Sequence, residues 1–309
     1  MDKRLKLMSY SSRLIQHECP RKLQLYKLRA DGTAETESDS ITFTFGHCVG
    51  LGIQLVLQGK SEYEILWQMF NVWNTDLFAE NKKQNKSFWT AVIAIQKFIA
   101  MCKSGYLQDY ELVQYQNKPA VELSFRIALP NEFFYRGHVD AVLKHKISGK
   151  IVVLEVKTSS SDTVNPASFK NSAQAIGYSV VLDVIFPSLS SYDVIYLVYK
   201  TKDKEYEQLK FPKSFLQRAQ WIQELLLDAD TIQMYDTVDI FPMHGESCAG
   251  KYYKDCEYLQ VCTLSTAYLT KPEPEVVDTV RGTDVPMIYQ IELTVADLIN
   301  SQLAKEILV

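Results

Sequence analysis

Three consecutive segments between residues 120 and 158 constrain the fold most, because very short turns join them. The segments are AVELSFRIAL, FFYRGHVDAVLKH and KIVVLEVKT, with PNE and SG as the turns. Apolar residues alternate along each segment, which is the pattern of β-strands. A turn of two or three residues joins antiparallel neighbours, whereas a parallel connection needs a dozen residues or more. The sequence therefore predicts an antiparallel meander of three strands.

Helical patterns surround this meander. Apolar residues recur at helical spacing in 46–58, 62–78 and 87–104, after two shorter helical segments. These shorter segments span 11–18, capped by Ser11 or Ser12, and 20–30. Beyond the meander, Asn165 and Pro166 open a predicted helix that runs to residue 186. A strand at 191–200 and a helix at 214–233 follow. We expect a mixed α/β core with an N-terminal helical layer.

The domain prediction follows these changes of pattern. We expect one domain over 1–262, made of a helical part (1–118), an α/β core (119–201), and a helix with a cysteine-rich segment (202–262). Residues 263–309 are predicted to be a C-terminal appendage, with KPEPE as a joint and a capped helix in 292–307.

Composition limits the kinds of partner. With 309 residues and 47% hydrophobic residues, the chain can bury a large core. The net charge of -4 means that a nucleic acid would have to bind to a local basic surface. No window approaches the roughly 18 consecutive apolar residues of a membrane span, and the first residues lack the apolar core of a signal peptide. We therefore expect a soluble, cytoplasmic protein with no membrane partner.

The apolar strand KIVVLEVKT carries two charged residues on one face. If Ser148 and Gly149 form a two-residue turn, Asp140 lies opposite Lys157 and diagonal to Glu155. Side chains two residues apart share a face, so the two carboxylates and the ammonium should converge. A solvated face beside Asp140 is the alternative interpretation.

Two carboxylates that converge in this way indicate a cation-binding site. Two carboxylates at this separation repel each other unless a cation bridges them, and oxygen ligands suit Mg²⁺ or Mn²⁺. A lysine beside such a cation can hold or help to deprotonate a water molecule aimed at a phosphate. The group therefore indicates phosphodiester hydrolysis.

Three short motifs, taken in order, resemble one branch of nucleases. GHVD at 137–140 fits G-x-x-D, EVK at 155–157 fits E-x-K, and QAIGY at 174–178 fits Q-x-x-x-Y. Together they resemble the RecB-like branch of the PD-(D/E)XK nuclease superfamily. The resemblance implies a restriction-endonuclease-like α/β fold, in which helices flank a mixed sheet.

The resemblance also implies roles for individual residues. The metal ligands would be Asp140, Glu155 and the backbone carbonyl of Val156, and Lys157 would be the catalytic lysine. Gln174 and Tyr178 would belong to the catalytic motif. Glu122 resembles an acidic position upstream of the G-x-x-D strand and is a weaker candidate ligand.

Basic and polar residues supply candidate DNA contacts. Lys170, Gln174 and Tyr178 fall at i, i+4 and i+8, so on one helix they would form a polar stripe facing a DNA backbone. Arg21 and Lys22, close to Cys19, are further candidates, as is the loop NKKQNK at 81–86. An ordinary solvated surface is the alternative for each of them.

Cysteine usage points to thiols or metal ligands, because six cysteines occur without a secretory signal. Cys48 and Cys102 lie in apolar helical patterns, where a small buried side chain is expected. The other four are Cys19, Cys248, Cys256 and Cys262.

These four cysteines extend the resemblance. In nucleases of the AddAB type and in the CRISPR adaptation nucleases, one cysteine before the nuclease core and three after it hold a [4Fe-4S] cluster. ECPRKLQLYKL at 18–28 resembles the first-cysteine helix of those proteins. Zn²⁺ is the alternative, because thiolates suit both; the absence of a C-x-x-C pair favours iron and sulfur.

Two departures from the family pattern concern the metal sites. Seven residues separate Cys248 from Cys256, where many relatives have two. Many relatives also carry G-x-x-x-H in an early helix, and here Gly50 stands at the histidine position. His47, three residues earlier, and His138, on the face of Asp140, are lesser candidates.

The sequence thus predicts a metal-dependent DNA nuclease, an exonuclease acting on a single strand or a DNA end. Recombination, repair or phage DNA processing is the expected setting, with a protein partner in such a complex. A non-catalytic DNA-binding or assembly subunit is the alternative. A zinc-containing endonuclease of restriction type is a third possibility, which the Q-x-x-x-Y motif disfavours.

Overall fold

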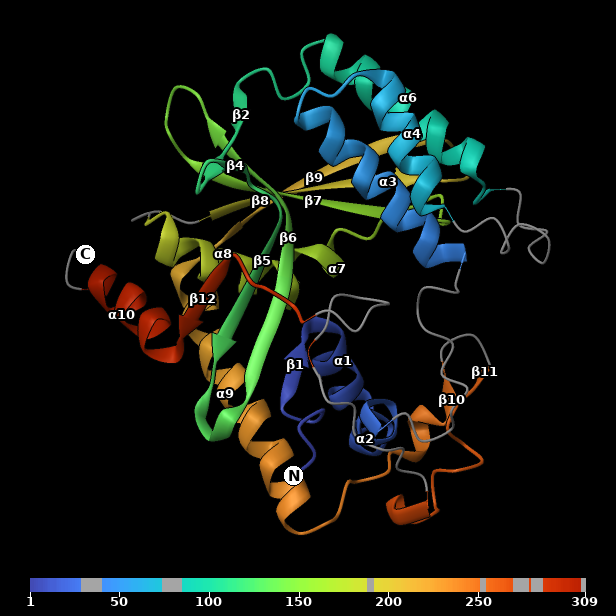
Figure 1. Ribbon diagram of the computed structural model, residues 1–309, viewed down its shortest axis with the longest axis vertical. Helices are drawn as coiled ribbons and strands as arrows, with labels where there is room; N and C mark the ends of the chain where they lie inside the picture. Colours follow the sequence, from blue (N-terminus) through green and yellow to red (C-terminus); the bar gives the residue numbers. More distant parts are fainter. Residues whose placement is uncertain are drawn as a thin grey trace. The chain divides into compact units, whose positions relative to one another are not determined.

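The computed structural model describes residues 1–28, 41–73, 85–187, 192–250, 254–268, 278 and 286–306 (Figure 1). It divides into two compact units. The central unit comprises residues 35–123 and 138–218, and the terminal unit comprises residues 1–34, 124–137 and 219–309. Strands β5 (Val121–Ala128) and β6 (Phe134–His145) contribute residues to both units.

A mixed sheet forms the core of the central unit. The end of β6 pairs antiparallel with β7 (Ile151–Ser159), which pairs parallel with β8 (Tyr192–Lys200). Strand β9 (Glu205–Lys213) lies antiparallel to β8. Strand β2 (Tyr110–Leu112) pairs with β6, and β3 (Gln114–Tyr115) forms a small hairpin with β4 (Lys118–Pro119). The parallel pair needs a crossover, and α7 (Ala167–Lys170) and α8 (Ala173–Ile185) lie in it.

Helices and sheet share one apolar core in this unit. Helices α3 (Ile41–Leu57), α4 (Glu62–Val72) and α6 (Phe88–Lys103) pack on the sheet (Figure 1). A Cβ atom at Gly52 would come within 2.6 Å of Ile95, so a glycine lets α3 and α6 approach closely. Along β7, both Val153 and Leu154 are buried although they point to opposite faces, so both faces of the sheet are covered. The predicted mixed α/β core is confirmed.

The turn between β6 and β7 differs from the prediction. Ala141 pairs with Leu154 and Lys144 with Ile151, and the His145 N–H donates to the Lys150 carbonyl at 2.9 Å. The turn therefore has four residues, 146–149, and Gly149 adopts a φ of +69°, which favours glycine. The predicted two-residue turn is wrong, and the register is displaced by two residues. A shift of two leaves every side chain on its expected face.

The crossover also differs from the prediction. A single helix from 165 to 186 was expected, but α7 ends at Lys170 and α8 begins at Ala173. The Asn165 side chain accepts a hydrogen bond from the Ala167 N–H at 3.0 Å, so the predicted cap is present. Lys170 is therefore not on the helix that carries Gln174 and Tyr178, and the predicted three-residue stripe is wrong.

Strand β9 was missed because its apolar alternation is weak and it contains Pro212. Its residues are mostly exposed or partly buried, and Pro212 pairs with Asp193 of β8. Proline cannot donate to a neighbouring strand, so it is tolerated at such a peripheral strand.

The terminal unit adds short strands to its own parts of β5 and β6. Strand β1 (Leu7–Ser9) pairs parallel with the start of β6, and β12 (Ile291–Thr294) pairs parallel with β5. Helix α10 (Val295–Glu306) follows β12 and is capped by a reciprocal Thr294 and Asp297 pair. The predicted helix over 292–307 is thus a strand followed by a helix. This part of the predicted appendage belongs to the sheet.

Three further helices and a small cysteine-rich hairpin complete the terminal unit. They are α1 (Tyr10–Glu18), α2 (Pro20–Leu28) and α9 (Phe215–Thr237), whose first turn belongs to the central unit, with β10 (Ala249–Gly250) paired to β11 (Lys254–Asp255). Ser9 caps α1, in place of the predicted Ser11 or Ser12. KPEPE lies outside the described residues. No helix in the described part of the chain is long and apolar enough to cross a membrane.

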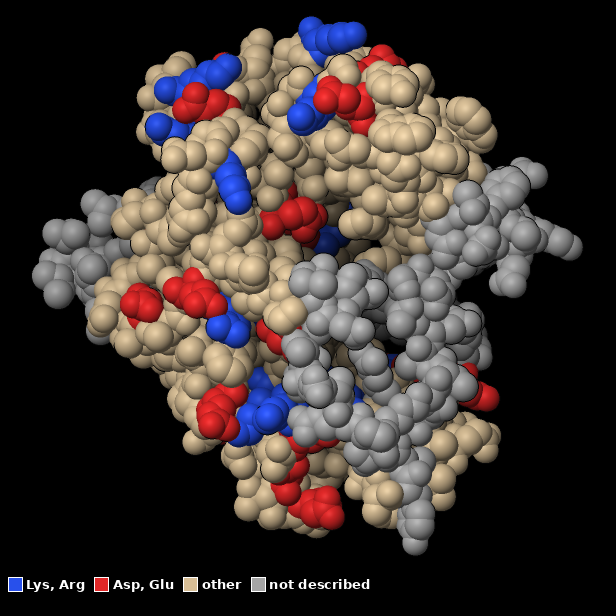
Figure 2. Space-filling model, viewed as in Figure 1, with Lys and Arg blue, Asp and Glu red and all other residues tan. Residues whose placement is uncertain are grey.

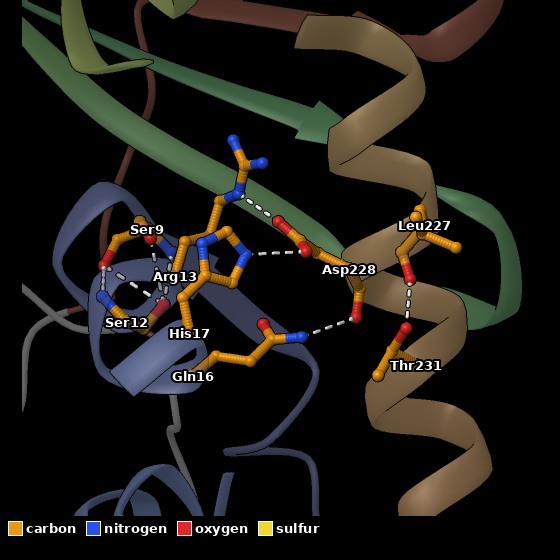
Figure 3. A network of polar contacts seen from close by, with 8 residues as sticks. All are labelled: Ser9, Ser12, Arg13, Gln16, His17, Leu227, Asp228 and Thr231. Carbon is orange, nitrogen blue, oxygen red and sulfur yellow. Dashed lines mark hydrogen bonds and ion pairs between the residues drawn. The ribbon is translucent and has the colours of Figure 1, made fainter. Parts of the chain in front are cut away.

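A buried ion pair joins α1 to α9 (Figure 3). Arg13 Nε lies 2.5 Å from Asp228 Oδ2, and His17 Nε2 lies 2.8 Å from Oδ1 of the same carboxylate. Gln16 Nε2 donates to the Asp228 backbone carbonyl at 3.1 Å. Arg13 and Asp228 are 4% and 8% exposed, so removing one of them leaves the other charge buried without its partner.

We expect Asp228→Ala to lower the free energy of unfolding by about 3 kcal/mol, because a buried Arg13 loses its counter-ion. The control is Asp162→Ala, which removes the exposed ion pair with Lys202 and should leave stability unchanged. Urea unfolding of both variants measures the difference. Equal stability of the two variants would contradict the importance of the Arg13–Asp228 pair.

Candidate active site

A cavity of about 540 Å³ lies in the central unit. One wall is α3, which contributes residues from Thr42 to Gln54. Asp140 of β6, residues 155–158 of β7 and Gln174 of α8 also line it, together with Glu122 of β5. The face shown in Figure 2 is hollowed beside this helical layer, and acidic atoms lie next to basic atoms there. Of the residues predicted to perform catalysis, Asp140, Glu155, Lys157 and Gln174 thus line one cavity, and Tyr178 does not.

Glu155 and Lys157 project from β7 into this cavity as a close ion pair. Lys157 Nζ lies 2.6 Å from Glu155 Oε1. The Glu155 carboxyl group is buried, with the residue 1% exposed, and its Oε2 atom has no hydrogen-bond partner among the described residues. A buried oxygen without a partner costs free energy, so this carboxylate is suited to binding a further cation or donor.

Asp140 reaches the same point from β6. Strand pairing ends with Ala141 opposite Leu154, so Asp140 and Glu155 come directly after the last pair. The Val156 N–H donates to Asp140 Oδ2 at 2.8 Å. Asp140 was predicted to lie opposite Lys157; the register displacement places it next to Glu155 and Val156 instead.

Burial makes this pair of carboxyl groups difficult to ionise. Burial raises the pKa of Asp140 well above its usual range, Glu155 raises it further, and Lys157 opposes them. Burial also raises the pKa of Glu155, against the effect of the Lys157 ammonium. One lysine is too little positive charge for the buried Glu155 carboxylate and the partly buried Asp140 carboxylate, so a second cation would stabilise their ionised form.

Gln174 and Tyr178 extend the site on α8. Lys157 Nζ donates to Gln174 Oε1 at 3.0 Å, and Gln174 Nε2 donates to the Tyr178 hydroxyl at 2.7 Å. The two residues lie one turn apart on the same face of α8. Lys157 is therefore held between the Glu155 carboxylate and the Gln174 amide.

Glu122 lines the cavity and is held by a residue that the sequence did not single out. Gln54 Nε2 of α3 donates to Glu122 Oε1 at 2.7 Å. Glu122 has a φ of +46°, in the left-handed region that non-glycine residues rarely adopt. One feature of the sequence could have pointed to Gln54. Its helical spacing from Gly50 and His47 places all three residues on one face of α3.

The candidate histidines differ in position. His47 and Gly50 both line the cavity, so His47 reaches it without rotation of the helix. A Cβ atom at Gly50 would have no neighbour within 4 Å, so this position is open. His138 is not among the residues that line the cavity.

The four cysteines predicted to act together line a second cavity, in the terminal unit. Cys19 of the α1–α2 junction meets Cys248, Cys256 and Cys262 there, and all four thiols are free. Burial raises the pKa of Cys262, and the three other cysteines raise it further while Arg21 opposes them. Among the described residues, no group of three or more His, Cys, Asp or Glu side chains is arranged to hold a metal ion as it stands.

The candidate DNA contacts are largely engaged within the chain. Arg21 donates to the carbonyls of Cys262 and Leu264, and Lys22 forms ion pairs with Glu18 and Glu257. Lys170 is exposed. Part of the loop at 81–86 lies outside the described residues. On the face shown in Figure 2, the described Lys and Arg side chains lie beside acidic ones and form no continuous basic band.

Comparison with known protein families adds to this geometry. The sequence pattern of the PD-(D/E)XK nuclease superfamily matches residues 8–263, most of the chain and all of the cavity described above. The chain belongs to the PD-(D/E)XK nuclease superfamily. This membership, with the observed mixed sheet and flanking helices, identifies a restriction-endonuclease-like nuclease fold. Members of this superfamily generally use Mg²⁺ or Mn²⁺ and act on DNA.

Solved structures give more distant similarities. A Eubacterium rectale protein, provisionally described as an exonuclease, shares 14% identity at a TM-score of 0.49, with 80% of this chain and 87% of that chain covered. The protein SSO0001 shares 15% identity at a TM-score of 0.29, with 68% of this chain and 81% of that chain covered. A search of curated proteins finds no match.

We expect Asp140→Asn to stabilise the metal-free nuclease at high pH. The folded-state pKa values of Asp140 and Glu155 are raised above their unfolded values, so the contribution of these two groups to wild-type stability falls as pH rises above about 4. In the presence of a chelator, the variant should exceed wild type in Tm at pH 8 by at least about 2 °C, and less at pH 5.

The control for this comparison is Asp109→Asn, because Asp109 is exposed and outside the cavity. It should match wild type at both pH values. A Tm difference for Asp140→Asn that does not change with pH would contradict the assignment of Asp140 as a carboxyl group with a raised pKa.

Proposed function

We propose that this nuclease is a metal-dependent exonuclease that hydrolyses phosphodiester bonds of DNA at a single strand or a free end. The observation that carries the proposal is the buried Glu155, whose Oε2 has no partner in the described part of the chain, beside Asp140 and Lys157 in one cavity. An alternative is a non-catalytic DNA-binding or assembly subunit that keeps the same residues.

The donor set of the cavity fits a hard divalent cation. Asp140, Glu155 and the Val156 carbonyl would hold Mg²⁺ or Mn²⁺, with Glu122 as a weaker candidate, and oxygen atoms are the donors that these ions prefer. When bound, such an ion supplies positive charge that stabilises a phosphoryl oxygen and favours ionisation of water. A cation here would also relieve the charge repulsion between Asp140 and Glu155.

Lys157 is placed to handle the attacking water. Its ammonium contacts both Glu155 and Gln174, so its position is set from two sides. In our proposal the Lys157 ammonium donates a hydrogen bond that holds a water molecule against the phosphate, and its charge stabilises the hydroxide that forms when this water loses a proton to solvent. Gln174 fixes the direction of the lysine side chain, and Tyr178 in turn orients the Gln174 amide. Four residues of two elements thereby act as one unit.

Action at a single strand or a DNA end is the finer part of the proposal. The feature that supports it is the Q-x-x-x-Y motif, which is typical of RecB-like nucleases. A role in recombination, repair or phage DNA processing, with a protein partner, belongs to the same proposal.

We expect wild-type protein with Mg²⁺ or Mn²⁺ to degrade end-labelled linear DNA, and Glu155→Ala or Lys157→Ala to lower the rate at least about 100-fold. Lys144→Ala and Glu111→Ala are matched controls, because they form an exposed ion pair on the same sheet outside the cavity. Both controls should retain full activity.

Closed circular DNA distinguishes an exonuclease from an endonuclease. Degradation of linear but not circular substrates supports the exonuclease, whereas cleavage of circles indicates an endonuclease. Salt-sensitive DNA binding without hydrolysis, measured with either metal, would favour the non-catalytic alternative. Equal hydrolysis by wild type, Glu155→Ala and Lys157→Ala would show that the active site lies elsewhere.

We further propose that Cys19, Cys248, Cys256 and Cys262 hold a [4Fe-4S] cluster, with Zn²⁺ as the alternative. The support is that four free thiols from distant parts of the sequence line one cavity of the terminal unit. Thiolate donors suit either group, and tying Cys19 to the distal segment would restrict the unfolded chain.

Protein purified without oxygen should be brown and contain acid-labile sulfide, and Cys256→Ser should lose both the colour and thermal stability. Cys102→Ser is the control, because Cys102 lies in α6 outside the second cavity, and it should retain the colour. Colourless protein with stoichiometric zinc would replace iron and sulfur by Zn²⁺, and protein without either metal would contradict both.

A further inference from the structure

Lys213, the last residue of β9, is buried in the central unit. It is 0% exposed, and it forms no ion pair with any described carboxylate. Its Nζ atom donates to the backbone carbonyls of Phe169 at 3.1 Å and Lys170 at 2.6 Å, and lies 5.6 Å from the centre of the Tyr196 ring. Burial lowers the pKa of Lys213 to about 8, so the side chain is mostly protonated at neutral pH.

The two carbonyl groups that Lys213 contacts belong to the last two residues of α7. The last carbonyl groups of a helix lack partners within the helix, and a lysine ammonium can satisfy them. The Phe169 ring lies 4.9 Å from the Tyr196 ring, so the same turn is also packed against β8. Lys213 therefore fixes the end of α7 to the sheet through hydrogen bonds, and Phe169 adds an aromatic contact.

The same turn leads directly into the helix that carries the active-site glutamine. The Phe169 carbonyl accepts a second hydrogen bond, from the Ser172 N–H at 3.3 Å, and the Ser172 carbonyl accepts one from the Ile176 N–H at 3.0 Å. Ser172 caps α8, and Gln174 follows two residues later. A continuous series of hydrogen bonds thus runs from Lys213 to the first turn of α8.

A second contact from the same side supports this connection. Gln217 Nε2 donates to Asn171 Oδ1 at 3.1 Å, and Gln217 follows Lys213 by four residues. The break between α7 and α8 is thus held at Phe169, Lys170 and Asn171 by one short segment of the chain. Since Gln174 Oε1 accepts from Lys157 Nζ, displacement of this break would move the partner of the catalytic lysine.

We propose that Lys213 is a positioning residue for Lys157, acting through the α7–α8 break and Gln174. The inference rests on the proposed function, because Lys157 is assigned there as the catalytic lysine. Without Lys213, the carbonyls of Phe169 and Lys170 would each lose the ammonium that ties them to β9, and α8 would start in a range of positions. Gln174 would then hold Lys157 less well, which lowers turnover more than substrate binding.

The test is a double-mutant cycle on the full chain with Mg²⁺ and linear DNA. Lys213→Met keeps most of the side-chain volume and removes the donors, and it should lower kcat roughly 10- to 100-fold with little change in KM. Gln174→Ala should cause a similar loss. In the double variant the losses should not multiply, because both changes act on one connection.

Lys210→Met is the matched control, because Lys210 lies on the same strand and forms a partly exposed ion pair with Asp193. It should retain wild-type kcat. Full activity of Lys213→Met, losses that multiply in the double variant, or an equal loss in Lys210→Met would each overturn the proposal. If Lys213→Met does not fold, Lys213→Gln, which keeps one donor group, takes its place in the same cycle.

Hydrogen exchange separates this proposal from the proposed function. The amides of Ser172 and Ile176 should exchange faster in Lys213→Met than in wild type and Lys210→Met. This readout does not depend on activity. An inactive wild type would contradict the proposed function alone, whereas unchanged exchange at Ser172 and Ile176 would contradict the role of Lys213 alone.

Discussion

The proposed active site depends on the electrostatic conflict between the buried carboxyl group of Glu155 and the partly buried one of Asp140, at the point where β6 and β7 stop pairing. Burial disfavours the charged form of each, and one lysine compensates for part of the cost. The mixed sheet and the helical layer supply the burial. The cavity beside α3 leaves room for a cation, whose charge would offset the two carboxylates.

The same conflict explains why the site needs external support for its lysine. Lys157 is attracted to Glu155 but also has to face the cavity, and Gln174 supplies the second contact that sets its direction. Gln174 lies near the start of α8, where the chain has just broken from α7. The precision of the site therefore depends on the residues that hold this break, Lys213 above all.

Much of the central unit could be predicted from local patterns. Alternation and short turns gave the meander, and helical spacing gave α3, α4 and α6, because each of these elements buries one regular face. The register of β6 and β7 could not be predicted, since turns of two and four residues preserve the same alternation and differ only in the backbone of residues 146–149. This error did not change the face to which each side chain points, so the predicted convergence of Asp140 and Glu155 did not depend on the length of the turn.

Other features depend on contacts distant in sequence. The break between α7 and α8 is stabilised by Lys213, which is more than forty residues away. The sequence near the break therefore does not predict it. Gln54 became a site residue only when α3 packed beside Glu122. Strand β12 is stabilised by parallel pairing with β5. Its four residues are too few for the sequence alone to identify them as a strand.

The central claim is that Asp140 and Glu155 bind a divalent cation beside Lys157. The most direct measurement is an anomalous difference map from crystals of the protein soaked in MnCl₂, with Glu155→Gln crystals treated in the same way. The account predicts a manganese peak between the two carboxylates in wild type and its loss in the variant. A wild-type map without a peak there, or with the same peak in Glu155→Gln, would contradict it.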